Sequence, residues 1–219
     1  GTSSSGGLAH GGGVQIGASN FITIAGNTFT GNAADLGPSG GFGGALHLIY
    51  TNDVQIAHNY FEGNRGGTGA GIGGAVTVEG SGAEAGFGGF IPETSGVSVQ
   101  AIDDPLVERV DIRANTFNDN RAAAARVGDQ ANMGGALALN NINGLKLANN
   151  VLAGNGATNG AAIMLFGWNR ATITATVADA AVTNNTLFNN EGESGFYIER
   201  WTTPLTLTNN IVVSHTVGI

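Results

Sequence analysis

Cysteine is absent from this chain of 219 residues, proline occurs only 4 times, and charged residues make up 11% of the total. A chain without cysteine is not a small domain held together by disulfides. Coiled coils and helical bundles are rich in Glu and Lys, and this sequence contains a single lysine. Because 8 basic residues face 16 acidic ones, the net charge of −8 argues against nucleic acid and anionic membrane as partners. No apolar run approaches the roughly 18 residues of a membrane span.

Glycine and asparagine are abundant instead, with 38 Gly and 24 Asn, and many of them recur at regular positions. The most regular feature is a six-residue pattern, Asn-x-apolar-x-x-Asn. Its copies begin at Asn27, Asn59, Asn115, Asn150, Asn185 and Asn210, and the last copy ends in His215 in place of Asn. The shortest step between two copies is 25 residues, from Asn185 to Asn210. Internal repeats of this length indicate a solenoid.

Apolar and polar residues alternate in the segment before each copy of the pattern. The apolar positions are Ile22 and Ile24, Val54 and Ile56, Val110 and Ile112, Leu145 and Leu147, Ala180 and Val182, and Leu205 and Leu207. The positions between them hold Thr23, Gln55, Asp111, Lys146, Ala181 and Thr206. Six segments with period-2 alternation in one register are strands that line one core. A second strand precedes each of them, and it opens on a glycine pair such as Gly43-Gly44 or on an equivalent such as Gly160-Ala161.

These spacings predict an all-β fold, a right-handed single-stranded parallel β-helix of about six coils. Residues 1–219 form one such segment, interrupted by an insertion loop at 80–106 and a smaller insertion at 169–177. We expect the Asn residues of successive coils to form a ladder that satisfies backbone groups in the turns, and the Gly pairs to allow close stacking. Phe29, Phe61 and Phe117 are expected to stack inside the core.

The alternation of Gly-Gly-Ala-apolar with Phe-x-x-Asn resembles a known family. The matching segments are Gly43–Leu46 with Phe61–Asn64, Gly73–Val76 with Phe117–Asn120, and Gly134–Leu137 with the weaker Leu152–Asn155. They are similar to the passenger repeats of polymorphic outer-membrane proteins of chlamydia-type bacteria, within the pectin-lyase-like superfamily of right-handed β-helices. The resemblance implies an exported or surface protein, often adhesive, while other members of that superfamily are polysaccharide lyases, hydrolases and epimerases.

A catalytic role would require charged side chains that converge on one face. Lyases of this shape use an Arg or Lys base beside an acidic Ca²⁺ cluster, and hydrolases use two or three carboxylates. The alternative catalytic site is Asp111 and Lys146 in adjacent coils with Arg113, although an exposed ion pair is the simpler interpretation. Asp103 and Asp104 are weak candidates for a metal, which would be Ca²⁺, and no other cofactor is expected. The four histidines fall in different columns of the repeat, so no shared imidazole site is expected.

A ligand-binding surface is predicted from the aromatic residues. Tyr50 and Trp201 both lie nine residues before their Asn motifs, and Trp168 lies near the same turn of the intervening coil. Arg170 and Arg200 are beside them in the sequence. Aromatic rings among polar groups suit the apolar faces of sugar rings, whereas the simpler interpretation is that the rings cover the edge of the core.

The sequence therefore favours an extracellular or cell-surface rod with a structural, adhesive or glycan-contacting role and no catalysis in this segment. The alternative is a polysaccharide lyase or glycoside hydrolase domain. The expected partner is a polysaccharide or cell-surface glycan, with no nucleic acid and no membrane span in this segment. Both ends lie within the repeat, so we also expect further coils of a longer chain or end-to-end self-association.

Overall fold

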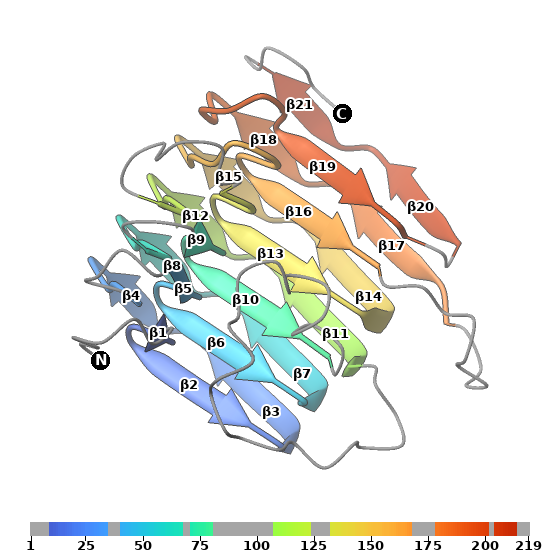
Figure 1. Ribbon diagram of the computed structural model, residues 1–219. Coiled ribbons are helices and arrows are strands. Elements are labelled where there is room, and N and C mark those ends of the chain that lie inside the picture. The colour runs from blue at the N-terminus through green and yellow to red at the C-terminus, as the bar shows by residue number, and fades with distance from the viewer. Residues whose placement is uncertain are drawn as a thin grey trace.

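A computed structural model of the protein describes residues 9–34, 40–67, 71–80, 107–123, 132–167, 178–201 and 204–213. These residues form strands and turns, and no helix in this part of the chain is long and apolar enough to cross a membrane. The chain winds through six successive coils, and each coil adds one strand to each of three parallel six-stranded sheets (Figure 1). The predicted parallel β-helix of about six coils is therefore confirmed.

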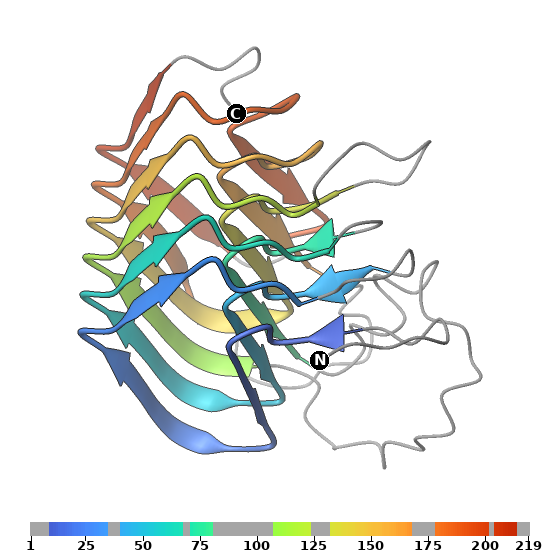
Figure 2. The same ribbon diagram turned by 90° about the vertical axis from the view of Figure 1, so that its left-hand side faces the viewer.

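Three sheets form the wall of the β-helix, and a smaller fourth sheet accompanies the first coils. Sheet B contains β2 (Val14–Gly17), β6 (Leu46–Ile49), β10 (Val76–Glu79), β13 (Leu137–Asn140), β16 (Ile163–Phe166) and β19 (Phe196–Glu199). Sheet C contains β3 (Asn20–Ala25), β7 (Asn52–Ala57), β11 (Val107–Arg113), β14 (Ile142–Ala148), β17 (Ala180–Thr183) and β20 (Leu205–Thr208). Sheet D contains β4 (Thr28–Thr30), β8 (Tyr60–Glu62), β12 (Thr116–Asn118), β15 (Val151–Ala153), β18 (Thr186–Phe188) and β21 (Ile211–Val213). Sheet A contains β1 (Ala9–His10), β5 (Gly41–Phe42) and β9 (Gly71–Ile72), and Figure 2 shows the coils stacked one on the next.

The register of sheet C agrees with the columns predicted from the sequence. Ile56, for example, pairs with Ile24 of the preceding coil and Ile112 of the following one, and its side chain is fully buried. The outward column also runs as predicted, through Thr23, Gln55, Asp111, Lys146, Ala181 and Thr206. Period-2 alternation thus separates the core from the surface in the middle coils of this sheet, whereas Leu207 in the sixth coil is 40% exposed.

The core contains the predicted aromatic stack. The rings of Phe29 and Phe61 lie 4.9 Å apart between centroids, those of Phe61 and Phe117 lie 4.8 Å apart, and both pairs are nearly parallel. Leu152 and Leu187 continue this column of sheet D. The ring separation is the strand spacing of about 4.8 Å, so the backbone ladder places the rings in contact.

Asparagine ladders run along the turns on both sides of sheet D, as predicted. In the first ladder, Oδ1 of Asn150 accepts hydrogen bonds from the backbone N–H of Asn115 at 3.0 Å and from its Nδ2 at 3.1 Å. Nδ2 of Asn150 donates to the carbonyl of Ile112 at 2.9 Å and to Oδ1 of Asn185 at 3.0 Å. The second ladder passes through Asn32, Asn64, Asn120, Asn155 and Asn190. His215, expected to end one ladder, lies outside the described residues.

Glycine is required where successive coils meet at the start of sheet B. A Cβ on Gly135 would lie 1.9 Å from the carbonyl oxygen of Ala161, and one on Gly74 would lie 1.9 Å from that of Gly135. Such contacts with backbone atoms cannot be relieved by a change of rotamer. The glycine pairs therefore belong to the stacking of the coils, as the repeat indicates.

Sheet A adds a second, smaller core on the outside of sheet B. Phe42 of β5 and Ile72 of β9 pack against Ala138, Met164 and Phe166, which belong to the middle strands of sheet B. Sheet B is consequently buried on both faces in its middle, as parallel sheets usually are.

Candidate functional site

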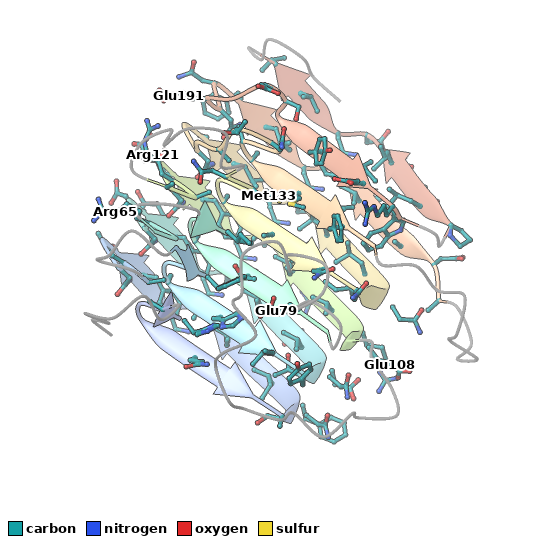
Figure 3. The ribbon with its side chains drawn as sticks, viewed as in Figure 1. Arg65, Glu79, Glu108, Arg121, Met133 and Glu191 are labelled. Carbon is teal, nitrogen blue, oxygen red and sulfur yellow. The ribbon has the colours of Figure 1, made fainter. Side chains whose placement is uncertain are left out.

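The outward side chains of sheet B contain the densest group of buried polar residues outside the ladders in the described part of the chain. Two outward columns run along this face. The first holds Gln15, His47, Thr77, Ala138, Met164 and Tyr197, and the second holds Gly17, Ile49, Glu79, Asn140, Phe166 and Glu199. We call these twelve residues the outer face of sheet B; Figure 3 shows Glu79 near its centre.

His47 and Glu79 form a buried pair at the centre of this face. His47 is fully buried and Glu79 is 4% exposed, and Nε2 of His47 donates a hydrogen bond to Oε1 of Glu79 at 2.6 Å. Two residues on adjacent strands of the same face thus hold each other in place. A buried carboxylate requires such a partner, because an unpaired charge in the interior is strongly unfavourable.

His10 extends the pair toward the edge of sheet A. Its Nδ1 lies 3.1 Å from Nδ1 of His47, and its ring stacks on His47 and on Phe42 with centroid separations of 4.8 and 5.2 Å. Burial lowers the pKa of His10 below its ordinary value of 6.5, the neighbouring His47 lowers it further, and Glu79 opposes both effects. In the structure two histidines from different columns of the repeat therefore meet, contrary to the expectation from the sequence.

Asn140 is the most unusual residue of the outer face. It is fully buried, and neither Oδ1 nor Nδ2 has a hydrogen-bond partner. Its neighbours in the column are Glu79 on one side and Phe166 on the other. Thr77, in the next column, is also fully buried, but its hydroxyl donates to the carbonyl of Ile72 at 2.8 Å. The unpartnered amide is thus particular to Asn140 among the asparagines of the described strands and ladders.

The C-terminal end of the outer face combines aromatic rings with charges. Tyr197 donates its hydroxyl hydrogen to Oε2 of Glu199 at 3.0 Å, and Nε of Arg200 lies 3.4 Å from Oε1 of the same carboxylate. The guanidinium of Arg200 lies over the ring of Phe166, 5.7 Å from its centroid. Burial raises the pKa of Tyr197, and the hydrogen bond to Glu199 raises it further. These residues are more exposed than the centre of the face, except for Phe166.

The residues predicted to bind a ligand are distributed differently from the expectation. Tyr50 and Arg200 each follow directly the end of a sheet B strand, β6 and β19, so they occupy equivalent corners four coils apart, with φ of 53° and 54°. Trp201 is one position further along, because the link from β19 to Asn210 is one residue longer than the link from β6 to Asn59.

The Trp201 side chain is half-buried against the main core, and its indole nitrogen is buried without a hydrogen-bond partner. Trp168 and Arg170 lie outside the described residues. Their predicted proximity to Trp201 therefore stays a prediction, as does the binding role of the whole group.

The alternative catalytic residues lie together on the outward face of sheet C. Asp111 pairs with Lys146 in the ladder, and its carboxylate accepts a hydrogen bond from Arg113. The side chains of Asp111 and Arg113 are 25% and 38% exposed, and Lys146 is exposed. This cluster contains one carboxylate and two cations, which suits an ion pair at the surface. Asp103 and Asp104, the metal candidates, lie outside the described residues.

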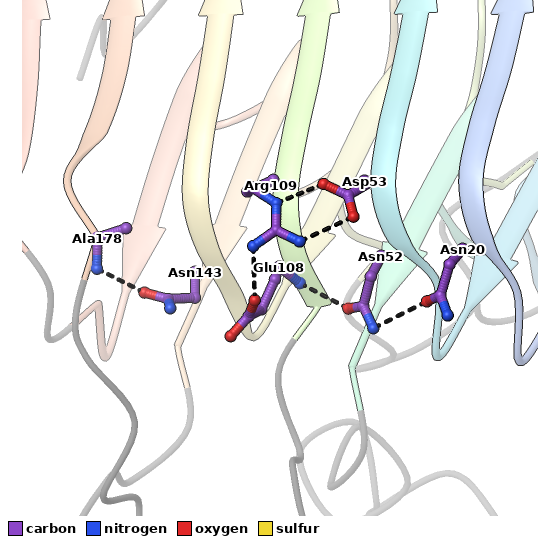
Figure 4. Close-up of polar contacts among 7 residues, drawn as sticks. All are labelled: Asn20, Asn52, Asp53, Glu108, Arg109, Asn143 and Ala178. Atoms are coloured by element: carbon purple, nitrogen blue, oxygen red, sulfur yellow. Dashed lines mark hydrogen bonds and ion pairs between the residues drawn. The ribbon is translucent and has the colours of Figure 1, made fainter.

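A second exposed cluster of ion pairs lies where strands β7 and β11 of sheet C bend, at Asp53 and Arg109, whose φ angles are 54° and 57° (Figure 4). Arg109 donates to both carboxylate oxygens of Asp53 and, at 2.8 Å, to Oε2 of Glu108. Arg109 lowers the pKa of Asp53 by hydrogen bonding and by its charge. Beside this cluster, Oδ1 of Asn52 accepts from the backbone N–H of Glu108 and its Nδ2 donates to Oδ1 of Asn20. These hydrogen bonds pair the polar side chains of the bend with one another and hold the backbone in this shape.

A third ion pair lies at the turns between sheet D and sheet A, where Figure 3 labels Arg121 and Glu191. Nη1 of Arg121 lies 2.8 Å from Oε2 of Glu191, two coils away, and the pair spans Gly156. Within the described ranges, no group of three or more His, Asp or Glu side chains is placed to hold a metal ion.

Comparison of the chain with protein-family models, with curated proteins and with solved structures finds no match.

Proposed function

We propose that this protein is a secreted or cell-surface β-helix rod that contacts glycans through the outer face of sheet B and has no catalytic role in this segment. The observation that carries the proposal is the cluster of Phe166, Tyr197 and Glu199 on two adjacent strands with Arg200, which directly follows β19. The partly exposed ring of Tyr197 offers an apolar face to a sugar ring, while the carboxylate and guanidinium offer hydrogen bonds to hydroxyl groups.

The rigidity of the rod supports this role. Phe166, Tyr197 and Glu199 project from strands whose backbones are bonded to their neighbours in a six-stranded parallel sheet, and Arg200 directly follows β19. Sites built on strands hold their side chains more accurately than sites on loops. The resemblance of the Gly-Gly-Ala and Phe-x-x-Asn repeats to bacterial surface passenger domains favours the same location outside the cell.

The alternative function, a polysaccharide lyase or glycoside hydrolase, would use Asp111, Arg113 and Lys146 on sheet C. The pairing of Asp111 with Lys146 in adjacent strands favours this alternative, because it places a basic side chain beside a carboxylate. Incubation with uronic-acid and neutral polysaccharides, followed by unsaturated-product absorbance and reducing-end assays, separates the two functions. Product formation that is lost in Lys146→Gln would support the enzyme and contradict our proposal.

Affinity electrophoresis through gels that contain neutral or uronic polysaccharides tests the proposal directly. We expect at least one polysaccharide to retard the wild-type protein, and we expect Tyr197→Ala and Arg200→Ala to reduce that retardation. Lys146→Gln, on the exposed face of sheet C, is the matched control and should behave as the wild type. A wild-type protein that migrates freely in every gel would contradict glycan contact.

A further inference from the structure

We infer that Arg65 and Arg121 bind the oxyanion group of an acidic ligand, a carboxylate, sulfate or phosphate, at the turns between sheet D and sheet A. This inference goes beyond the proposed function, because neither residue belongs to the outer face of sheet B. The two residues form a parallel bridge between successive coils, so their backbones lie one strand spacing, about 4.8 Å, apart. Figure 3 shows both of them along one edge of the molecule.

Arg65 lacks a carboxylate partner among the described residues. Its Nε is buried and makes no hydrogen bond, and no other contact pairs its charge. The other four described arginines each form an ion pair with an Asp or Glu side chain. In a chain of 8 basic and 16 acidic residues, an unpaired arginine is therefore an exception. A buried donor without a partner destabilises the folded state, and a bound anion would supply that partner.

Arg121 places a second positive charge beside Arg65. Like charges at paired positions repel each other, so two neighbouring arginines are unfavourable unless an anion lies near them. Nη1 of Arg121 lies 2.8 Å from Oε2 of Glu191 and would lie 2.7 Å from a Cβ on Gly156, so the side chain extends away from Arg65. Glu191 is three positions from Arg65 in this column of bridges. It balances one of the two positive charges and leaves the other.

The surface beside Arg65 is open to solvent. Ala33 is its neighbour in the preceding coil, and Gly31 and Gly63 each lie two residues earlier in these two coils. A Cβ on either glycine would meet no atom within 4 Å. The Arg65 side chain is partly exposed, and that of Arg121 is 43% exposed. A ligand group can therefore reach both guanidinium groups without a change in the backbone.

Two guanidinium groups select an oxyanion as the ligand. Each presents its donors in a planar fork that pairs with two oxygens of one carboxylate, sulfate or phosphate. Arg65 has its donors available, and Arg121 contacts Glu191 through Nη1. The carboxylate of Asp119 is directed into the following coil, where Oδ1 would lie 2.2 Å from a Cβ on Gly154. It thus faces away from Arg65 and leaves the approach of an anion open.

The test follows the arginine Nε–H signals by heteronuclear NMR during titration with sodium sulfate, inorganic phosphate or galacturonate oligosaccharides, at an ionic strength held constant with chloride. We expect the Arg65 signal to shift and saturate with at least one of the three. The signal of Arg113, which is ion-paired on sheet C, should stay in place. Calorimetric titration with the same anion should show binding at least tenfold weaker in Arg65→Gln and at least threefold weaker in Arg121→Gln. Arg113→Gln is the matched control and should bind as the wild type does.

Glu191→Gln separates anion binding from a structural role of the two arginines. The substitution removes the carboxylate that competes for Arg121, so we expect the affinity for the anion to rise at least twofold. Cooperative thermal unfolding checks that each variant is folded. Saturation by sulfate or phosphate alone would identify a tetrahedral oxyanion, and saturation by the oligosaccharides alone would identify a carboxylate. The inference is overturned if no anion saturates the Arg65 signal, if Arg113 shifts equally, or if folded Arg65→Gln keeps wild-type affinity.

Discussion

Asn150 and Asn140 belong to the same coil, and both are buried almost completely, yet they are used in opposite ways. The side chain of Asn150, in the ladder, makes hydrogen bonds to Asn115, Ile112 and Asn185. The amide of Asn140, on the outer face of sheet B, makes none. The ladder shows how this fold satisfies a buried amide when stability is what matters. The outer face departs from that rule, and such departures are expected where a protein binds something.

The same contrast holds between the outward faces of sheet B and sheet C. On sheet C the charges of Asp111, Arg113 and Lys146 are close to solvent and to one another. On sheet B a histidine, a glutamate and an asparagine are buried side by side. Exposed ion pairs change the free energy of folding little. Buried polar residues outside a ladder can lower stability, so the outer face of sheet B says more about function than the outward face of sheet C.

The largest loss of stability is expected from Asn150→Ala in the ladder. The substitution leaves the buried backbone N–H of Asn115 without its partner, and it removes one hydrogen bond each from Nδ2 of Asn115, which keeps the carbonyls of Ile56 and Arg113, and from the carbonyl of Ile112. At about 1–3 kcal/mol for a buried group left unpaired and about 1 kcal/mol for each further hydrogen bond lost, we expect a loss of roughly 3 kcal/mol or more. Chemical denaturation measures it, and Asn118→Ala in β12 of sheet D is the control. A loss below about 1 kcal/mol would remove the distinction between ladder and face.

A smaller loss is expected from Thr77→Val on the outer face. Thr77 is fully buried, and valine keeps its shape while removing the hydrogen bond to the carbonyl of Ile72. That carbonyl also accepts from the backbone N–H of Gly43, so it keeps one partner. We expect a loss of about 1 kcal/mol in the free energy of unfolding. A gain in stability would mean that partnered polar groups of this face are unfavourable as well.

The smallest expected effect is the change of stability with pH that His10 causes. Its pKa is lowered in the folded protein, chiefly by burial, so below pH 6.5 the unfolded chain takes up this proton more readily than the folded one. The stabilisation is complete above pH 6.5 and is lost as the pH falls through the interval beneath that value. We expect the melting temperature of the wild type to fall more between pH 7.5 and pH 5 than that of His10→Gln. Equal falls would show that His10 does not contribute.

Much of the fold could be predicted from the sequence. Period-2 alternation, placed in register by the first Asn of each motif, identifies both columns of sheet C and the stack of Phe29, Phe61 and Phe117. These features repeat in every coil, and stacking turns each repeat into a column. The asparagine ladders could be predicted for the same reason.

The candidate site could be predicted less well, because it depends on contacts outside the repeat. His10 lies on a two-residue strand whose column, His10, Phe42 and Ile72, directly precedes the first glycine of each pair. That regularity is visible in the sequence, but its packing against sheet B is not. The equivalence of Tyr50 with Arg200 was missed because one extra residue after β19 shifts the last coil.

Thermal unfolding of Asn140→Leu beside Asn150→Ala is the most direct test of the distinction between ladder and outer face. Because the amide of Asn140 makes no hydrogen bond, replacing it by an apolar side chain should preserve the unfolding free energy or raise it by about 1 kcal/mol. Asn150→Ala should lower the melting temperature by roughly 6 °C or more, at about 2–4 °C for each kcal/mol in a chain of this size. A fall for Asn140→Leu as large as that for Asn150→Ala would contradict the account, because Asn140 would then be a structural residue.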